Sequence, residues 1–467
     1  MDKRIALFVV TLLSARVWAE DLPELPETVI TATREPTDIL DSPSFVTVVT
    51  QKDIQESGGD DLSAVLDHQS GVVVNDYGPQ GQGKQVSIRG STSSQVLVMV
   101  DGIRLNSSFD GYVDLSRIPV DNIDHIEIVR GGASSLWGTG AVGGVINIIT
   151  KKPDRPELTL DISNGSYIPH DATTVTSWPY GGSATTSFTP ASAMSLFDNQ
   201  RVSLSAAGKL GDIGLTGGGA FTRAMNAFIW DDTANLGSWR LRNNAQDLGE
   251  DAYAGADLPF VDGSLSTRGS VDHSLIGVPG GAAPGYATPQ DTQEDTSVLG
   301  SLAYQGDRFF SDKLDLSVKG SYRYTQEILT DPAFQSIHAT NAGTLDLTQK
   351  FTISDMVSAV YGGNGSYEVV NSTNLSGTNN RLTLAGFLSV PFSPVQALTI
   401  TPSVRYDYYS DFPGFLAFQV GTVYSLSNVS SLRASFGSAY RVPTLSDLYW
   451  TDPFFGTTGN PNLKPET

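Results

Sequence analysis

The stretch Lys313 to Gln326, KLDLSVKGSYRYTQ, alternates between two kinds of side chain. Its apolar and aromatic positions fall on one side of an extended chain: Leu314, Leu316, Val318, Tyr322 and Tyr324. Its polar and charged positions fall on the other side: Asp315, Ser317, Lys319, Ser321 and Arg323. Because successive side chains of a β-strand point to opposite faces, this period of two predicts a strand with one apolar and one polar side.

The same period recurs in later segments of about the same length. They are Leu382 to Val390, Leu398 to Tyr408, Leu416 to Tyr424 and Leu432 to Tyr440. Each is about 10 residues long, which is the length that a tilted strand needs to cross a bilayer. Several end in tyrosines, as strands do where they meet a membrane interface.

Two architectures alternate in this way, and strand length separates them. The strands of a soluble β-sandwich average about 5 or 6 residues, roughly half the length found here. The connections also differ in length, from the short Pro-bearing turn between Leu388 and Leu398 to the long polar stretch from Phe228 to about Thr296. Short turns on one side and long polar loops on the other are typical of membrane barrels. The sequence therefore predicts an all-β transmembrane β-barrel of antiparallel strands.

The N-terminus has the pattern of a secretory signal peptide. Lys3 and Arg4 precede an apolar run from Ile5 to Leu13, and Val17-Trp18-Ala19 follows at the usual cleavage spacing. A membrane anchor is the alternative, but it needs about 20 apolar residues, about twice the length of this run. We therefore expect residues 1–19 to be a signal peptide that is cut after Ala19.

Two further segments precede the alternating region, which we place at residues 153–467. Residues 20–36 contain three prolines around the β-branched patch Thr28-Val29-Ile30-Thr31, which predicts an extended, flexible arm. Residues 37–152 have the pattern of a compact α+β domain. Its expected strands are blocks of hydrophobic residues at Phe45 to Thr50, Val96 to Val100, Ile123 to Val129 and Val145 to Thr150, with a helix around Asp61 to Gln69.

Composition and motifs argue against several classes of function. The net charge of -21 argues against a nucleic-acid partner, and the absence of cysteine rules out disulfides and thiolate sites. Residues 138–143 fit the dinucleotide pattern G-x-G-x-x-G, but a strand-like run follows where that motif needs a helix. The five histidines are scattered and no G-x-S-x-G elbow is present. We therefore expect no enzymatic activity.

An ordered set of short motifs resembles the TonB-dependent receptor family over the N-terminal 150 residues. The matching stretches are Glu27 to Arg34, Val86 to Gly90, Val98 to Arg104, Ile126 to Gly131 and Gly143 to Thr150. Two later stretches, Ala439 to Thr444 and Gly459 to Glu466, are similar to the family's mid-barrel signature. Within the family the N-terminal domain is most similar to cobalamin receptors, through Arg89 to Val98 and Asp114 to Ser116.

This resemblance implies a 22-stranded barrel with residues 37–152 as a plug inside it. Residues 153–467 are long enough for about 14 strands, so we expect a sheet that is open at its last strand and a chain that is incomplete at its C-terminus. It also implies a Ton box, the segment that pairs with the partner protein TonB, at Thr28, Val29, Ile30, Thr31 and Ala32. That segment is stiff and extended, which suits the addition of a strand to the edge of a partner's sheet.

Further roles follow from the resemblance. Arg89 and Arg130 match arginines that hold the plug against carboxylates of the barrel wall. The matching substrate platform lies in two polar loops at residues 75–85 and 106–113. A position-by-position match to the cobalamin receptor points to Gly83, Gln85, Thr92, Phe109 and Asp110. Gly83 and Phe109 depart from its side chains, which leaves the ligand open. Asp291, Glu294 and Asp295 lie where that receptor's loops bind calcium, although an acidic solvated loop is the alternative interpretation.

The resulting hypothesis is an active-transport receptor in the outer membrane of a Gram-negative-type bacterium. It would act as a monomer, surrounded by outer-membrane lipid, and import cobalamin or a ferric siderophore using energy delivered through TonB. No cofactor would be required, with calcium in the extracellular loops as an option. A surface barrel that binds a ligand without transporting it remains the alternative, and it would need no Ton box.

Overall fold

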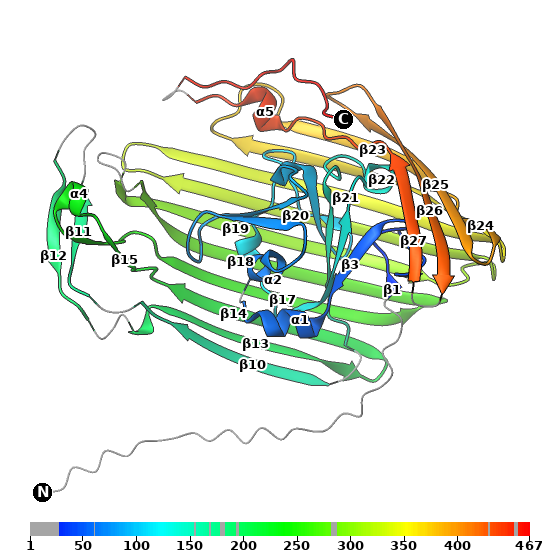
Figure 1. Cartoon of the computed structure of the whole chain (residues 1–467), viewed down its shortest axis with the longest axis horizontal. Helices are drawn as coiled ribbons and strands as arrows, with labels where there is room; N and C mark the ends of the chain where they lie inside the picture. Colours follow the sequence, from blue (N-terminus) through cyan, green and yellow to red (C-terminus); the bar gives the residue numbers. More distant parts are fainter. Residues whose placement is uncertain are drawn as a thin grey trace, which may run out of the picture.

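The computed structural model describes residues 28–59, 61–153, 156–167, 170–177, 183–192, 196–281, 287–427, 430–452 and 456–467. The expected signal peptide and residues 20–27 of the arm lie outside the described residues. A small N-terminal domain, drawn in blue and cyan in Figure 1, lies within the curve of a much larger sheet, which we call the wall. No described helix is long and apolar enough to cross a membrane.

The N-terminal domain is built around a five-stranded mixed sheet in the order β3-β8-β9-β6-β7. Its elements are β1 (Thr28–Val29), β2 (Thr37–Asp38), β3 (Phe45–Val49), α1 (Gln51–Ser57), α2 (Leu62–Asp67), β4 (Val72–Asp76), β5 (Lys84–Ile88), η1 (Ser93–Gln95), β6 (Val96–Val100), β7 (Ile103–Arg104), η2 (Leu115–Arg117), β8 (Ile123–Arg130), α3 (Ser134–Trp137) and β9 (Gly144–Thr150). The four strands and the helix expected from hydrophobic blocks are confirmed to within a few residues.

Both faces of this sheet are covered, which explains why its strands are uninterrupted hydrophobic runs. On one face Ile126, Ile128 and Ile146 pack with Ile54 of α1 and Leu66 of α2. On the other face a second apolar cluster includes side chains from the arm. Helix α1 begins with a reciprocal cap, in which the Thr50 amide donates to the Asp53 carboxylate and the Asp53 amide donates to the Thr50 hydroxyl.

The wall is a 14-stranded antiparallel sheet, as the expected strand count predicted. Its strands are β10 (Glu157–Gly165), β13 (Asn199–Leu210), β14 (Ile213–Ala224), β17 (Asp247–Phe260), β18 (Gly263–Gly280), β19 (Ala287–Gly306), β20 (Leu314–Thr330), β21 (Gln335–Ser354), β22 (Val357–Ser372), β23 (Asn380–Ser389), β24 (Phe392–Val395), β25 (Leu398–Tyr409), β26 (Phe415–Ser427) and β27 (Ser430–Gly437). Among the described residues β10 pairs only with β13 and β27 only with β26, so the sheet is open between these two strands.

Smaller elements lie at the ends of the wall strands. A four-stranded sheet, β12-β11-β16-β15, extends beyond one end (Figure 1). It comprises β11 (Ala172–Ser177), β12 (Thr185–Thr189), β15 (Ile229–Asp231) and β16 (Trp239–Leu241), with the short helix α4 (Thr233–Leu236) between the last two. Helix α5 (Leu445–Tyr449) follows the last wall strand and lies near the loops of the N-terminal domain, because the Leu445 amide donates to the Ser108 carbonyl.

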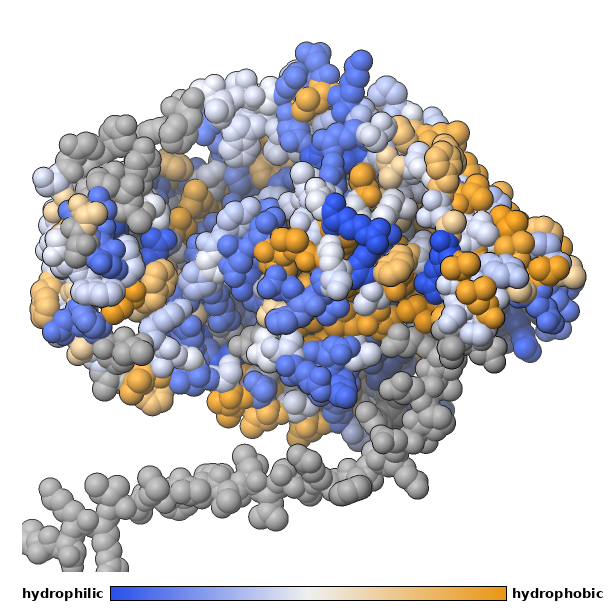
Figure 2. All heavy atoms as spheres, in the orientation of Figure 1, coloured by the Kyte–Doolittle hydropathy of each residue, from blue (hydrophilic) through white to orange (hydrophobic). Residues whose placement is uncertain are grey.

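The alternation predicted from sequence separates the two faces of the wall. In β25, Val404, Tyr406 and Tyr408 are exposed on the outer face, whereas Arg405 and Asp407 are buried against the N-terminal domain. Figure 2 shows hydrophobic residues gathered at the right-hand margin, where Figure 1 places β24 to β27. An apolar outer face around a polar interior is the pattern of a membrane barrel.

One sequence expectation about the strands of the wall was wrong. The stretch from Phe228 to about Thr296 was expected to be a long polar loop, but it contains all of β17 and β18 and the first half of β19. The outer face of β17 is formed largely by Ala252, Ala254 and Ala256, which are weakly hydrophobic. Because alanine differs little in hydrophobicity from the polar residues that alternate with it, the period of two was not visible in the sequence.

Candidate functional site

The described part of the arm, residues 28–36, is docked against the N-terminal domain, contrary to the flexible segment expected for residues 20–36. Strand β1 pairs antiparallel with β2, and Val29, Thr31 and Ala32 are buried. Val29 and Ala32 pack with Leu97 and Val145 on the second face of the central sheet. Local composition predicted flexibility because it could not show that this face of the sheet packs against the arm.

Polar side chains of the sheet hold the backbone of the arm. The Glu127 carboxylate accepts hydrogen bonds from the amides of Ile30, at 3.0 Å, and Thr31, at 2.7 Å. The Trp137 indole N–H donates to the Thr31 carbonyl at 2.8 Å, and the Asn147 side-chain amide donates to the Thr31 hydroxyl at 2.9 Å. No local sequence pattern predicts these contacts of Glu127, Trp137 and Asn147 with the arm.

Arg34 fixes the end of the arm to the wall. Its guanidinium forms an ion pair with Asp346 of β21 at 3.0 Å and donates to the Leu136 carbonyl at 3.0 Å. The same group lies over the rings of Trp137, at 4.1 Å, and Phe387, at 4.4 Å. These cation–π contacts and the ion pair place the arm between the N-terminal domain and the wall.

A cavity of about 430 Å³ lies between the loops of the N-terminal domain and wall strands β18 to β21. We call it the loop cavity. Four of the five predicted substrate residues line it, namely Gly83, Gln85, Phe109 and Asp110. The fifth, Thr92, lies outside the described cavities, and its backbone amide donates to the Gln95 side-chain oxygen at 3.0 Å as part of a helix cap. Loops separated by more than 20 residues thus meet at one place.

An aromatic group borders the loop cavity and an adjoining hollow of about 510 Å³. The Phe109 ring stacks on His338 of β21 with ring centroids 4.7 Å apart, and Trp450 lies 5.7 Å from His338. The three rings come from segments more than 100 residues apart in the sequence, so no local pattern could have grouped them. Aromatic surfaces of this kind are common in sites that bind large organic ligands.

Carboxylates outnumber basic groups around the loop cavity. Its lining contains the acids Asp110, Asp114, Asp272, Asp295 and Glu327 and the bases Arg117 and Arg323. Burial raises the pKa of the Asp110 carboxyl, although the Ser107 hydroxyl donates to it. At their ordinary charges these side chains would give the lining a net negative charge.

Neighbouring wall strands place acids directly opposite each other. Asp295 of β19 is the cross-strand partner of Glu327 of β20, and Asp251 of β17 is the partner of Asp272 of β18. Like charges directly opposite each other destabilise a sheet. Arg117 offsets part of this cost, because its guanidinium lies 3.4 Å from Asp295 and 3.5 Å from Asp247.

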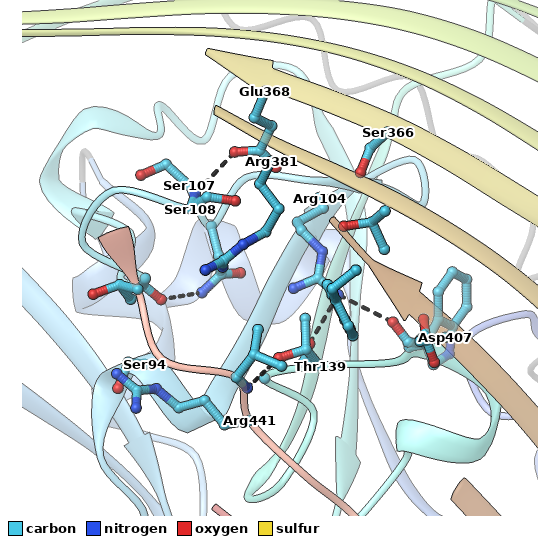
Figure 3. Close-up of a pocket in the computed structure, with 18 of the residues that line it drawn as sticks. Ser94, Arg104, Ser107, Ser108, Thr139, Ser366, Glu368, Arg381, Asp407 and Arg441 are labelled. Atoms are coloured by element: carbon cyan, nitrogen blue, oxygen red, sulfur yellow. Dashed lines mark hydrogen bonds between the residues drawn. The ribbon is translucent and has the colours of Figure 1, made fainter. Parts of the chain in front are cut away.

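A second, smaller cavity lies between the N-terminal domain and wall strands β22 to β25 (Figure 3). Arg104, Arg381, Arg405 and Arg441 line it together with Glu368 and Asp407. Its volume of about 70 Å³ fits a few water molecules and is too small for an organic nutrient. Arg104 donates to the Trp137 and Thr139 carbonyls, and Glu368 accepts from the Ser108 amide, so this cavity is part of the contact between the two units.

Sequence models of two protein families match the chain, one after the other. The TonB-dependent Receptor Plug Domain matches residues 38–145, and the TonB dependent receptor-like beta-barrel matches residues 151–467. The chain belongs to the TonB-dependent receptors. The N-terminal domain is therefore the plug, and the wall is the barrel sheet.

Individual relatives point to two kinds of ligand. The chain is 26% identical over 468 aligned residues to the vitamin B12 transporter BtuB of Vibrio vulnificus, covering 96% of this chain and 67% of the relative. A mutant of the ferric enterobactin receptor PfeA from Pseudomonas aeruginosa, solved with enterobactin, has a TM-score of 0.66 and 17% identity, covering 88% of this chain and 64% of that one. The siderophore receptor PirA from Acinetobacter baumannii has a TM-score of 0.66 and 17% identity, covering 90% and 67%.

The receptor spans roughly two thirds of the length of these relatives. At 17% identity the two solved structures show the fold alone. The plug and barrel expected from sequence motifs are confirmed by the family matches and by the structure.

Arg89 and Arg130 do not make the plug-to-wall ion pairs predicted for them within the described residues. Arg130 donates to the Ser70 carbonyl at 3.0 Å and to the Thr47 hydroxyl, so its bonds stay inside the plug. Arg89 is exposed and lies 5.8 Å from the Phe45 ring. The motifs next to the strands predicted that each arginine side chain is held in one place. They could not identify the group that holds it.

Other residues link the plug to the wall. The ion pairs run from Arg34 to Asp346, from Arg117 to Asp247 and Asp295, from Arg201 to Asp121, and from Lys350 to Glu35. They join the wall at β13, β17, β19 and β21. The ion-pair contact expected from the family is therefore present with different partners.

The three acids proposed as calcium ligands lie in strand β19 and not in a loop. Asp291 and Asp295 share one face of the strand, and Glu294 points to the other. Within the described part of the chain, no three histidine or acidic side chains are grouped as a metal site requires. These residues do not form a site in this conformation, and calcium binding stays a prediction.

Proposed function

We propose that this chain is an outer-membrane receptor that binds a scarce nutrient in the loop cavity and imports it into the periplasm with energy delivered by TonB. The observation that carries the proposal is the convergence of Gly83, Gln85, Phe109 and Asp110 on one cavity of about 430 Å³. A cavity of this size with aromatic walls and a few polar groups suits an organic ligand. The Ton box lies elsewhere on the plug and leaves this cavity open to a ligand.

A continuous set of contacts joins the loop cavity to the Ton box. The Asn106 side chain accepts from the Val98 amide and donates to the Val96 and Gly111 carbonyls, which fastens the loop carrying Phe109 to β6. Strand β6 pairs with β9, where Met99 is opposite Asn147. Because Asn147 donates to the Thr31 hydroxyl, a ligand that moves the loop can act on the Ton box through packed and hydrogen-bonded groups.

Cobalamin is the ligand that we favour. The curated relative reported above is a vitamin B12 transporter, and the carboxylates of the loop cavity match the amide donors around a corrin ring. Ferric catecholate siderophores carry a net negative charge, which the acid excess would repel. A ferric siderophore is the second candidate, because the structural neighbours include siderophore receptors.

Equilibrium titration of the purified chain with cyanocobalamin and with ferric enterobactin tests the ligand. We expect cobalamin to bind with a Kd of about nanomolar order and the anionic siderophore to bind at least about 100-fold more weakly. Phe109→Ala should weaken cobalamin binding about tenfold or more by removing the ring at the cavity floor. Tight siderophore binding with none for cobalamin would reject the favoured ligand and leave the receptor assignment in place.

A further inference from the structure

The Ton box, residues 28–32, packs on one face of the plug sheet. This face contains two buried polar side chains among apolar ones. Its apolar members include Leu97, Val129 and Val145. Glu127 of β8 and Asn147 of β9 are cross-strand partners in the middle of this face, and their exposures are 0% and 2%. Burying a carboxylate is costly unless hydrogen bonds satisfy it, so its position requires an explanation.

The Ton box supplies those hydrogen bonds. The amides of Ile30 and Thr31 both donate to the Glu127 carboxylate, and His125 approaches the same carboxylate at 3.4 Å. With the bonds from Trp137 and Asn147, the amide, carbonyl and hydroxyl of Thr31 are all engaged by plug side chains. Side chains, and not an extension of the central sheet, therefore hold this segment.

The docked conformation is incompatible with strand pairing to a partner. A segment that extends a partner's sheet must offer its backbone amides and carbonyls to that sheet. The amides of Ile30 and Thr31 donate to Glu127, the Thr31 carbonyl accepts from Trp137, and the Ile30 carbonyl accepts from the Arg34 amide. Docking on the plug and pairing with TonB are thus alternatives, and whichever residue stabilises docking sets the fraction of receptors available to TonB.

We propose that Glu127 is the positioning residue of the Ton box, holding it on the plug in the resting receptor and controlling its release. The inference rests on the proposed function, since it takes residues 28–32 to be the TonB-binding segment. The chemistry suits a reversible latch. Water can replace the lost amide donors once the segment leaves, so a carboxylate tolerates the vacated state better than an apolar side chain would.

The chain contains no cysteine, so one introduced thiol reports on release. Val29→Cys places a slightly smaller side chain at a position with 0% exposure in the docked segment. We expect a bulky maleimide to modify this cysteine slowly in the resting receptor. Adding Glu127→Gln, which keeps the shape and removes the charge, should raise the rate about 10- to 100-fold, the effect of losing one or two charge-assisted hydrogen bonds.

Three controls separate a latch from general loosening. Glu56→Gln changes an exposed glutamate on α1 and should leave the rate unchanged. A reporter at Val65→Cys, in the core on the other face of the sheet, should stay protected in every variant. Glu127→Asp, which retains the charge on a shorter side chain, should restore part of the protection.

A second variant covers the case in which Glu127→Gln disturbs the plug. Trp137→Phe removes the indole donor to Thr31 and leaves Glu127 in place, and it should also raise modification at position 29 but not at position 65. If neither variant raises modification at position 29 above that at position 65, the latch is refuted. If modification rises while the purified periplasmic domain of TonB still fails to bind, the latch stands and the proposed partner is wrong.

Discussion

Arg117 links the plug to two wall strands, because its guanidinium pairs with Asp247 of β17 and Asp295 of β19. The motifs led to an expectation of plug arginines that face wall carboxylates, and they pointed to Arg89 and Arg130. The partners of Arg117, Asp247 and Asp295, lie more than 100 residues away. Local patterns predict side chains that share a strand or a loop, and they cannot predict which distant strand faces them.

Removing Arg117 should loosen the plug. Arg117→Ala leaves Asp247 and Asp295 without their cation, and we expect a loss of about 2–5 kcal/mol at this contact. The readout is single-channel conductance in a planar bilayer together with the urea midpoint of unfolding. Arg89→Ala is the matched control, because Arg89 is exposed and makes no ion pair with a described residue, and it should change stability by less than about 0.5 kcal/mol. Equal effects of the two variants would contradict the assignment.

His125 should make plug stability depend on pH. Burial lowers its pKa, but hydrogen bonds to Asp124 and Glu127 outweigh burial and raise the pKa to about 9. A raised pKa in the folded state contributes stability that is fully present below the ordinary histidine pKa of about 6.5 and is lost as the pH rises through about 9. Unfolding of the plug followed across this window should show the loss.

The matched variant for this pH effect is His125→Gln, which keeps a polar side chain and cannot titrate. Its stability should lack the decline between about pH 6.5 and pH 9 that the native plug shows. A decline of the same size in both proteins would show that another group is responsible.

At the scale of elements, the strength of the hydrophobic contrast decided how well the sequence predicted each strand. Segments with leucine, valine and tyrosine outside and charges inside, such as β20 and β25, were predicted close to their observed bounds. Strand β17, with alanines outside, was missed. The arm was expected to be flexible because its docking depends on a sheet face that only the tertiary structure reveals.

The free-energy cost of placing a charged side chain on the outer face of the wall should depend on its depth in the bilayer. Leu345 lies near the middle of β21 and is 59% exposed on the outer face, whereas Leu426 lies near the end of β26 at 58%. Leu345→Arg should destabilise the folded chain in lipid by about 2–4 kcal/mol, and Leu426→Arg by about 0–1 kcal/mol. Unfolding in liposomes measures both. Equal costs would mean that the outer face does not meet a bilayer.

At the scale of the whole molecule, the plug-in-barrel architecture could be predicted from sequence because it depends on period, strand length and ordered motifs. The candidate site was predicted only in its plug half, through Gly83, Gln85, Phe109 and Asp110. The wall half, with Glu327 and His338, was not predicted. It forms only when the curvature of the sheet brings separate strands around the plug.

Energy-coupled import is the central claim, and uptake of labelled cobalamin tests it most directly. Cells that lack their own cobalamin receptor would carry this chain within a closed-barrel receptor, either intact or without residues 28–32, each with and without TonB. We predict uptake only where the chain retains these residues and TonB is present, with the same surface binding in all four strains, because the deleted segment lies outside the loop cavity. Uptake that persists without residues 28–32 or without TonB, or binding with no uptake in any strain, would contradict the account.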